Sequence, residues 1–210
     1  MKLIVFLLFT LSFFPIESAA QASDVGSPNS TKKKQEQSEC LSGNCTDGWG
    51  NYQHINDKGQ YIGFFFNGSR SGYGLYQWAD AKYIGNWDTA MNGYGVYIKD
   101  NGDDMSGMWK DGQLNGYGTT ITDGEWKRGV FENGNMSITY NFYSNNVDKG
   151  CTAGDCESKY GRYEWSNGDY FVGFFKNGNM LMGKYNFADG NKYSGEFNSN
   201  NQYHGTGRYY

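Results

Sequence analysis

One short pattern recurs along most of this chain. An aromatic residue, a glycine and a second aromatic stand at alternate positions, a turn follows, and glycines then return at alternate positions. The pattern occurs at YIGFFFNGSRSGYGLY (61–76), YIGNWDTAMNGYGVY (83–97) and MSGMWKDGQLNGYG (105–118). Repetition at a fixed period is typical of architectures in which each unit packs only against its neighbours. The repeat therefore constrains the fold before any candidate active site is considered.

Each unit is predicted to be one β-hairpin. Side chains alternate between the two faces of a strand, so Tyr61, Gly63 and Phe65 share one face. Asn67-Gly68, between the two halves of the unit, is a strong hairpin-turn signal. We expect each glycine to leave room for a ring from a neighbouring strand to lie over the backbone. Because one hairpin alone is marginally stable, neighbouring hairpins must stack to bury these rings.

Composition supports an all-β fold for the region that starts at Cys40. This region contains neither of the two prolines and is rich in glycine and aromatic residues. These features favour antiparallel strands joined by tight turns, and no helical period is evident. We predict an elongated single-layer array of stacked antiparallel β-hairpins.

The repeated residues are similar to the MORN repeat, a family of hairpin units of about twenty residues. Its core reads roughly Tyr-x-Gly-x-Trp/Phe, a turn, then Gly-x-Gly-x-Tyr. Met105 occupies the first aromatic position of one unit, and the unit that ends in Gly183 and Tyr185 lacks one glycine. The predicted structural core of the repeats consists of Tyr61, Gly63, Phe65, Gly72, Gly74, Tyr76, Tyr83, Gly85, Trp87, Gly93, Gly95, Tyr97, Gly107, Trp109, Gly116, Gly118, Phe171, Gly173, Phe175, Tyr193, Gly195, Phe197, Gly205, Gly207 and Tyr209.

The chain is predicted to have five parts. Residues 1–22 have the lysine, apolar run and small residues of a secretory signal peptide. Residues 23–39 are polar, and we expect a disordered linker there. Two MORN-type blocks, 40–118 and 151–210, flank a divergent segment, 119–150, which is either a degenerate hairpin or a bridge. In that segment, Gly124, Glu125 and Trp126 resemble the start of a first strand.

Both blocks begin in the same way, with CLSGNC (40–45) and CTAGDC (151–156). In each, a repeat glycine follows five residues after the second cysteine, and a half unit opens the block. The sequence is thus similar to that of a secreted, bacterial-type member of the family with C-x4-C block starts. The residues of the two half units are Gly48, Gly50, Tyr52, Gly161 and Tyr163.

Four cysteines in an exported chain favour disulfides. In a continuous array the two cysteine pairs would lie on the order of 50 Å apart, because adjacent strands are ~4.8 Å apart. Bridged Cα atoms lie within about 7 Å, so cross-block pairing and a shared zinc site are out of reach. We therefore predict the local bridges Cys40–Cys45 and Cys151–Cys156. Free thiols are the alternative.

The sequence nominates no catalytic residue, metal ligand or cofactor. Its two histidines, His54 and His204, fall at hairpin edges without a partner pattern, and we expect surface turn residues. The Gly-x-Gly pairs belong to strands and are not followed by a helix, as a dinucleotide-binding loop would be. From Cys40 onward 14 Lys and Arg face 18 Asp and Glu, a net charge of −4, which disfavours nucleic acid as a partner.

Two functions stay open. The leading hypothesis is an exported, non-catalytic scaffold that binds an unknown protein or associates with itself. The resemblance implies scaffolding, dimerisation and sometimes membrane association. The alternative is a module that binds a glycan or a lipid headgroup through an aromatic groove, although no basic patch supports membrane contact. Ile62, Phe64, Val172 and Phe174 place apolar groups on the face away from the glycines, and an exposed apolar patch usually marks a partner site.

Overall fold

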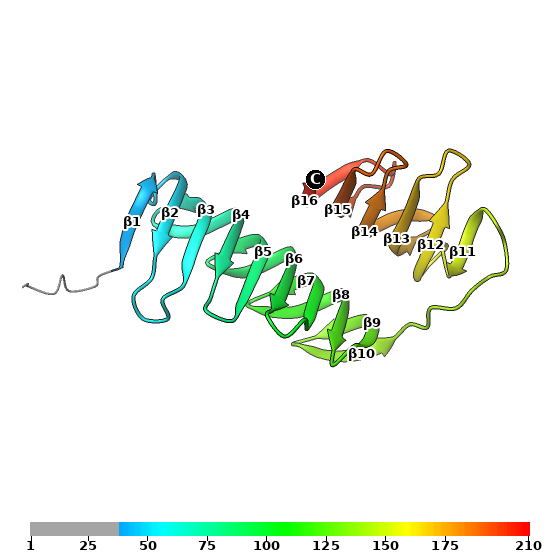
Figure 1. Ribbon diagram of the computed structural model, residues 1–210, viewed down its shortest axis with the longest axis horizontal. Coiled ribbons are helices and arrows are strands. Elements are labelled where there is room, and N and C mark those ends of the chain that lie inside the picture. Colours follow the sequence, from blue (N-terminus) through cyan, green and yellow to red (C-terminus); the bar gives the residue numbers. More distant parts are fainter. Residues whose placement is uncertain (1–37) are drawn as a thin grey trace, which may run out of the picture. The chain divides into compact units, whose positions relative to one another are not determined.

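The computed structural model describes residues 38–210, which form antiparallel β-sheets (Figure 1). The predicted signal peptide and nearly all of the predicted linker lie outside the described residues. The boundary of the linker moves, because the first strand begins at Glu39 and the Ser38 hydroxyl oxygen accepts a hydrogen bond from the Ile55 amide (2.9 Å). The folded region therefore starts slightly before the first cysteine.

Sixteen strands form two sheets within residues 38–210, and in each sheet the strands follow one another in chain order. The first sheet consists of β1 (Glu39–Gly43), β2 (Gly48–Gln53), β3 (Gln60–Phe66), β4 (Ser69–Gln77), β5 (Ala81–Asp88), β6 (Ala90–Lys99), β7 (Asp104–Lys110), β8 (Gln113–Thr122), β9 (Glu125–Glu132) and β10 (Asn135–Thr139). The second consists of β11 (Gly150–Gly154), β12 (Tyr160–Glu164), β13 (Tyr170–Lys176), β14 (Asn179–Asn186), β15 (Lys192–Phe197) and β16 (Tyr203–Tyr209). The predicted all-β hairpin array is confirmed.

A row of glycines crosses each sheet in register. In the second sheet every strand contributes one glycine, and each pairs with the glycine of the next strand. In the first sheet the row runs without interruption from β1 to β9. The first row is Gly43, Gly50, Gly63, Gly74, Gly85, Gly95, Gly107, Gly118 and Gly129, and the second is Gly154, Gly161, Gly173, Gly183, Gly195 and Gly207.

Rings lie over these glycines. As we expected, a ring covers a glycine of the neighbouring strand, and the same ring also covers a glycine of its own strand. A Cβ added at Gly85 or Gly95 would overlap the ring of Tyr83, which stands two residues before Gly85. The Tyr83 hydroxyl then donates to the Asn86 carbonyl (3.2 Å). The side chain thus lies along its own strand and covers both its own glycine and the paired one. Tyr61, Phe171 and Tyr193 have the same arrangement.

The first glycine of each Gly-x-Gly has a different role. Gly72 has φ +61°, and a Cβ added there would meet nothing closer than 3.7 Å. It lies where the pairing register between β3 and β4 shifts. A glycine tolerates positive φ without steric cost, which allows the bulge. Gly93 (φ +77°) occupies the equivalent shift between β5 and β6.

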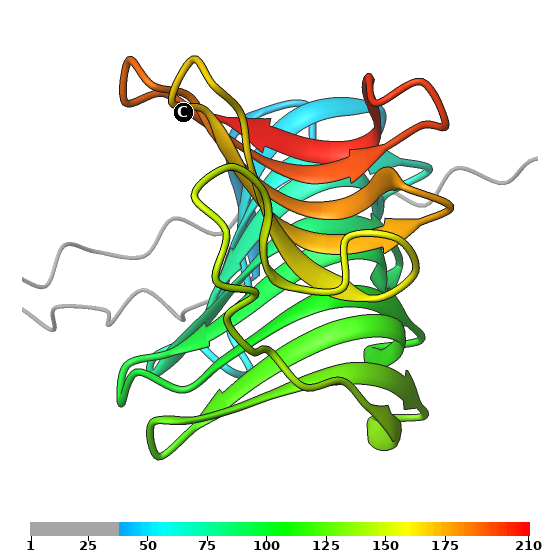
Figure 2. The same cartoon turned by 90° about the vertical axis from the view of Figure 1, so that its right-hand side faces the viewer.

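The array is not one continuous layer. The first sheet ends at β10, and the second sheet packs against the first instead of extending it (Figures 1 and 2). Phe174 of β13 lies 5.0 Å from Tyr117 of β8 between ring centroids, and Tyr160 of β12 lies beneath the Arg128 guanidinium of β9 at 5.2 Å. The connection after β10 reverses the direction of the array, and the repeat pattern contains no signal for this reversal.

Segment 119–150 divides into two parts. Up to Thr139 it completes the first sheet as the end of β8, β9 and β10, and only the residues after that form the bridge to β11. The expected first strand is present as β9, which begins at Glu125, whereas Gly124 lies in the turn before it with φ +77°. Gly129 and Phe131 instead hold the glycine and second aromatic positions, and Phe131 is buried.

Both predicted local disulfides are formed, with Cα–Cα distances of 5.9 Å for Cys40–Cys45 and 5.8 Å for Cys151–Cys156. A Cβ added at Gly50 would lie 2.7 Å from the Cys45 sulfur. A Cβ added at Gly161 would lie 2.9 Å from the Cys156 sulfur. Each sulfur therefore covers the first repeat glycine of its block, in the position that a ring takes further along.

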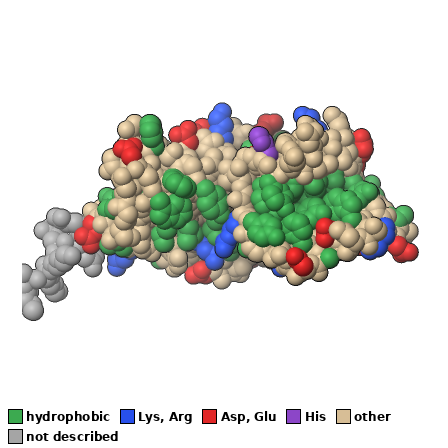
Figure 3. Space-filling model, turned by 90° about the horizontal axis from the view of Figure 1, so that it is seen from above, with side chains coloured by type: hydrophobic (Ala, Val, Ile, Leu, Met, Phe, Trp, Pro, Cys, Tyr) green, Lys and Arg blue, Asp and Glu red, His purple; other side chains and the backbone are tan. Residues whose placement is uncertain are grey.

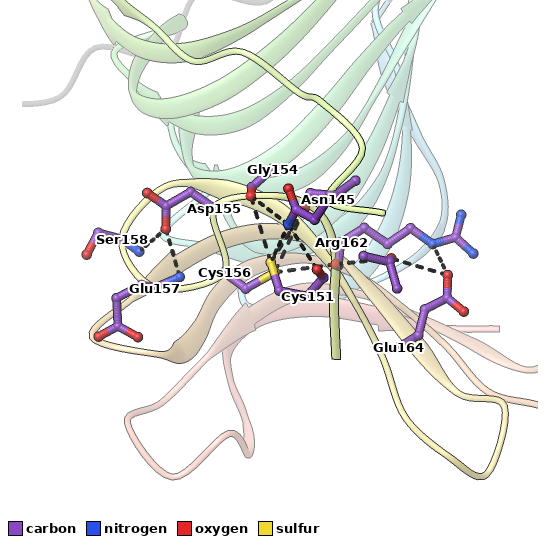
Figure 4. The surroundings of a disulfide bond; sticks show 11 residues. Asn145, Cys151, Gly154, Asp155, Cys156, Glu157, Ser158, Arg162 and Glu164 are labelled. Atoms are coloured by element: carbon purple, nitrogen blue, oxygen red, sulfur yellow. Dashed lines mark hydrogen bonds and ion pairs between the residues drawn. A yellow bond between two sulfur atoms is a disulfide. The ribbon is translucent and has the colours of Figure 1, made fainter. Parts of the chain in front are cut away.

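The second disulfide is also tied to the bridge segment (Figure 4). The Asn145 amide donates to the Cys151 carbonyl (2.9 Å) and the Gly154 carbonyl (3.1 Å). These bonds attach the end of the bridge to the strand that opens the second sheet.

Candidate binding surface

The aromatic residues of the repeat core form two buried clusters, one in each sheet. Tyr61, Tyr83 and Phe171 are fully buried. Their rings meet the second aromatic of the repeat edge to face, as Tyr83 meets Trp87 at 5.0 Å between centroids. Aromatic pairs in this geometry stabilise a core beyond the area they bury. These rings are core residues and do not line an open groove.

Indole hydrogen bonds join successive repeats within the first cluster. The Trp87 Nε1 donates to the Gly74 carbonyl (3.2 Å), and the Trp109 Nε1 donates to the Gly95 carbonyl (3.0 Å). Each tryptophan therefore satisfies its buried N–H on a glycine of the preceding hairpin. Tyr209, on the last strand, is the exposed aromatic residue of the predicted core set, at 55%.

The face opposite the rings is divided between a covered part and an uncovered part. Phe174, which we placed in an exposed apolar patch, is 3% exposed because the two sheets bury it between them. Phe64, which we placed in the same kind of patch, is 47% exposed. The chain itself therefore covers one half of the predicted partner site.

Trp49 and Phe64 form the centre of the uncovered part. They are paired across β2 and β3, and their rings meet edge to face at 5.0 Å. Trp49 is 49% exposed. Ile62 and Leu75, both half-buried, pair with each other on the same face. Hydrophobic side chains are visible at the surface as separate patches (Figure 3).

His54 is not the free surface residue that we expected. It is half-buried, and its ring lies 4.8 Å from Tyr52 and 5.4 Å from Tyr76. Burial, and secondarily the charge of Arg70, lowers the pKa of His54. His204 is exposed, in β16.

The turns carry carboxylates that hold neighbouring hairpins together. The Asp169 carboxylate accepts hydrogen bonds from the Tyr185 hydroxyl and the Ala188 amide, both at 2.8 Å. Asp57 accepts from the Tyr76 hydroxyl at 2.7 Å. Among residues 38–210 no group of three or more His, Cys, Asp or Glu side chains could hold a metal ion. None of the same residues forms a helix long and apolar enough to cross a membrane.

Comparison with known families agrees with the hairpin geometry. The sequence model of the MORN repeat matches residues 61–81, 83–104, 106–121, 160–170 and 193–210. The chain is a MORN-repeat protein. The matches fall in both sheets, so the two sheets are two MORN-repeat blocks. No curated protein sequence matches the chain.

The MORN-repeat pattern missed some residues of the glycine rows. Gly129 was not predicted because Lys127 occupies the position where the repeat has its first aromatic residue. The signal that remained was Gly129-x-Phe131, half of the motif. Gly43 and Gly154 belong to the rows through pairing with Gly50 and Gly161, and the matched cysteine spacing was the only clue to them.

Proposed function

We propose that this MORN-repeat protein is an exported, non-catalytic scaffold that binds a partner protein through the uncovered apolar face around Trp49 and Phe64. MORN repeats are consistent with a binding or scaffold role. The two disulfides are compatible with an exported protein, because such bonds persist in oxidising compartments. The apolar run and small residues at the start of the sequence support export through a signal peptide.

The observation that carries the proposal is the exposure of the Trp49–Phe64 pair. Both rings leave about half of their surface in water, at 49% and 47%. Tryptophan and other aromatic side chains are enriched at protein interfaces, where they act as anchors. Two such rings in contact on one face of the sheet form the centre of the proposed interface.

The second sheet supports a protein as the occupant. Further along the first sheet, the same face is covered by aromatic and aliphatic side chains of a β-sheet, among them Tyr160, Phe174 and Met182. The uncovered part continues this interface through Ile62 and Leu75. A partner that presents a similar apolar surface would extend the packing that the chain already makes with itself.

A glycan or a lipid headgroup has less support as the occupant. Such a module would use the rings beside the glycines, and those rings are buried. The net charge of −4 from Cys40 onward also disfavours an anionic membrane.

The test is site-specific photo-crosslinking of the chain in the exported fraction of its own cells. A photoreactive amino acid at position 64 should give one protein adduct, and Trp49→Ser should reduce its yield at least about fivefold. The same amino acid at position 138 is the matched control, because Ile138 is also 49% exposed but lies on β10. Equal adducts at both positions would contradict the proposal, as would no adduct at position 64. An adduct of twice the chain's mass would show that the face binds a second copy of the chain and not a different protein.

A further inference from the structure

A cavity of about 600 Å³ lies between the two sheets. Its walls come from β4 to β9 on one side and from β12 to β16 on the other. Pockets for small organic ligands occupy roughly 300–1,000 Å³. The cavity is separate from the uncovered face, since neither Trp49 nor Phe64 lines it.

The wall from the second sheet carries a row of cations. The residues next to the glycine row pair across the strands in the order Arg162, Val172, Lys184, Ser194 and Arg208. All five line the cavity. The cations stand on alternate strands, so with strands ~4.8 Å apart neighbouring cations are about 10 Å apart.

The wall from the first sheet is mainly apolar at the corresponding position. Ile84 and Val96 pair with each other beside Gly85 and Gly95, and both line the cavity. Tyr94, also in the wall, is 9% exposed. A ligand in the cavity would therefore meet cations on one side and aliphatic or aromatic surface on the other.

Two of the three cations have no carboxylate partner. Arg162 is engaged, because its Nε lies 2.9 Å from a Glu164 carboxylate oxygen. Among the ion pairs of residues 38–210, none involves Lys184 or Arg208. Instead, both lie over the Tyr210 ring, at 5.9 Å and 5.4 Å from its centroid. Two unpaired cations at one cavity stand out in a region whose net charge is negative.

One acidic side chain, Asp104, also lines the cavity, on the wall from the first sheet. Burial raises the pKa of Asp104, and a hydrogen bond from Ser106 opposes that shift. The cations and this acid lie on opposite walls, which gives an anionic ligand a preferred orientation.

We propose that this cavity binds a small amphipathic organic anion. Its carboxylate lies between Lys184 and Arg208, beside the Ser194 hydroxyl, and its apolar body lies against Ile84 and Val96. Charge-assisted hydrogen bonds to a carboxylate are stronger than neutral ones. The apolar wall adds a hydrophobic contribution that a bare inorganic anion cannot use.

The test is isothermal titration calorimetry of the mature chain with 2-naphthoate, 2-naphthamide and inorganic phosphate. We expect 2-naphthoate to bind at one site and at least about tenfold more tightly than the neutral amide or phosphate. Lys184→Met and Arg208→Met should each weaken naphthoate binding about tenfold. Lys82→Met is the matched control, because Lys82 is an exposed strand lysine outside the cavity.

Four results would overturn the proposal. Naphthoate does not bind, the amide binds equally well, phosphate binds equally well, or Lys82→Met weakens binding as much as Lys184→Met does. Thermal unfolding of each variant accompanies the titration. Since Lys184 and Arg208 are not buried, we expect both variants to fold.

Discussion

The ring of Tyr83 occupies the space in which a side chain of Gly95 would lie. The two residues are on adjacent strands, β5 and β6, and Tyr83 also covers Gly85 of its own strand. This relationship explains why glycine recurs in the middle of strands, where it is otherwise unfavourable. A row of glycines forms a channel along the sheet, and rings or disulfide sulfurs fill it.

Gly95→Val should lower the melting temperature by about 5 °C or more. The added side chain meets the Tyr83 ring, and overpacking of this kind costs roughly 1–3 kcal/mol, with each kcal/mol lowering the melting temperature by about 2–4 °C in a chain of this size. Asp88→Ala, an exposed position at the end of β5, should change it by less than about 2 °C. Differential scanning calorimetry of both variants is the measurement. If neither substitution changes the melting temperature, the ring-over-glycine packing is refuted.

Removal of the first disulfide should loosen the start of the first sheet. In the double variant Cys40→Ala, Cys45→Ala, we expect a loss of about 2 kcal/mol, as the loop-entropy model gives for so short a ring. The Cys45 sulfur also covers Gly50, so amide hydrogen exchange should rise mainly in β1 and β2. An equal rise across both sheets would show that the bridge does not act locally.

Phe174→Ala should cost about 3–5 kcal/mol, the range for truncating a buried phenylalanine. Phe174 is 3% exposed and contacts Tyr117 of one sheet and Tyr160 of the other. Urea unfolding measures the change, with Phe66→Ala as the control because Phe66 is 64% exposed. If both variants lose less than about 1 kcal/mol, the sheets do not pack as described.

The stabilising contribution of the Asp169 carboxylate should be lost in acid. Hydrogen bonds from the Ala188 amide, and then from Asn167 and Tyr185, lower the pKa of Asp169 in the folded state. Its contribution is therefore present above the unfolded pKa of about 3.9 and is lost as pH falls through the lower folded value.

Asp169→Asn is the variant that tests this contribution. Urea unfolding should show Asp169→Asn less stable than the parent chain at pH 7, with the difference shrinking at about pH 2.5. A difference that stays constant over that range would exclude a role for the carboxylate charge. Because Asp169 is close to the surface, the effect should be modest.

The repeat explains why the hairpins and the disulfides could be predicted. Tyr61, Gly63 and Phe65 alternate, and alternation alone places them on one face. The local pairing of Cys40 with Cys45 was predicted from a continuous array, and the pairing is confirmed although the array is not continuous. The pairing is local because the two cysteines of each pair are only five residues apart in the sequence.

The reversal of the array could not be predicted, because it depends on contacts between residues far apart in sequence. Nothing in the spacing around Phe174 distinguishes it from Phe64, yet one is buried between the sheets and the other is exposed. The bulge at Gly72 was not predicted either. A glycine can be required because a side chain would not fit or because φ is positive, and a single sequence does not distinguish these two causes.

The most direct test of the two-sheet arrangement is a nuclear Overhauser measurement between the ring protons of Tyr117 and Phe174. These residues are on β8 and β13, and their ring centroids lie 5.0 Å apart. The cavity and the limits of the uncovered face both depend on this contact. We expect a clear cross-peak between the two rings, which Phe174→Leu removes. The account is contradicted if the spectra show the contacts within each sheet, such as Tyr83 with Trp87, but none between Tyr117 and Phe174.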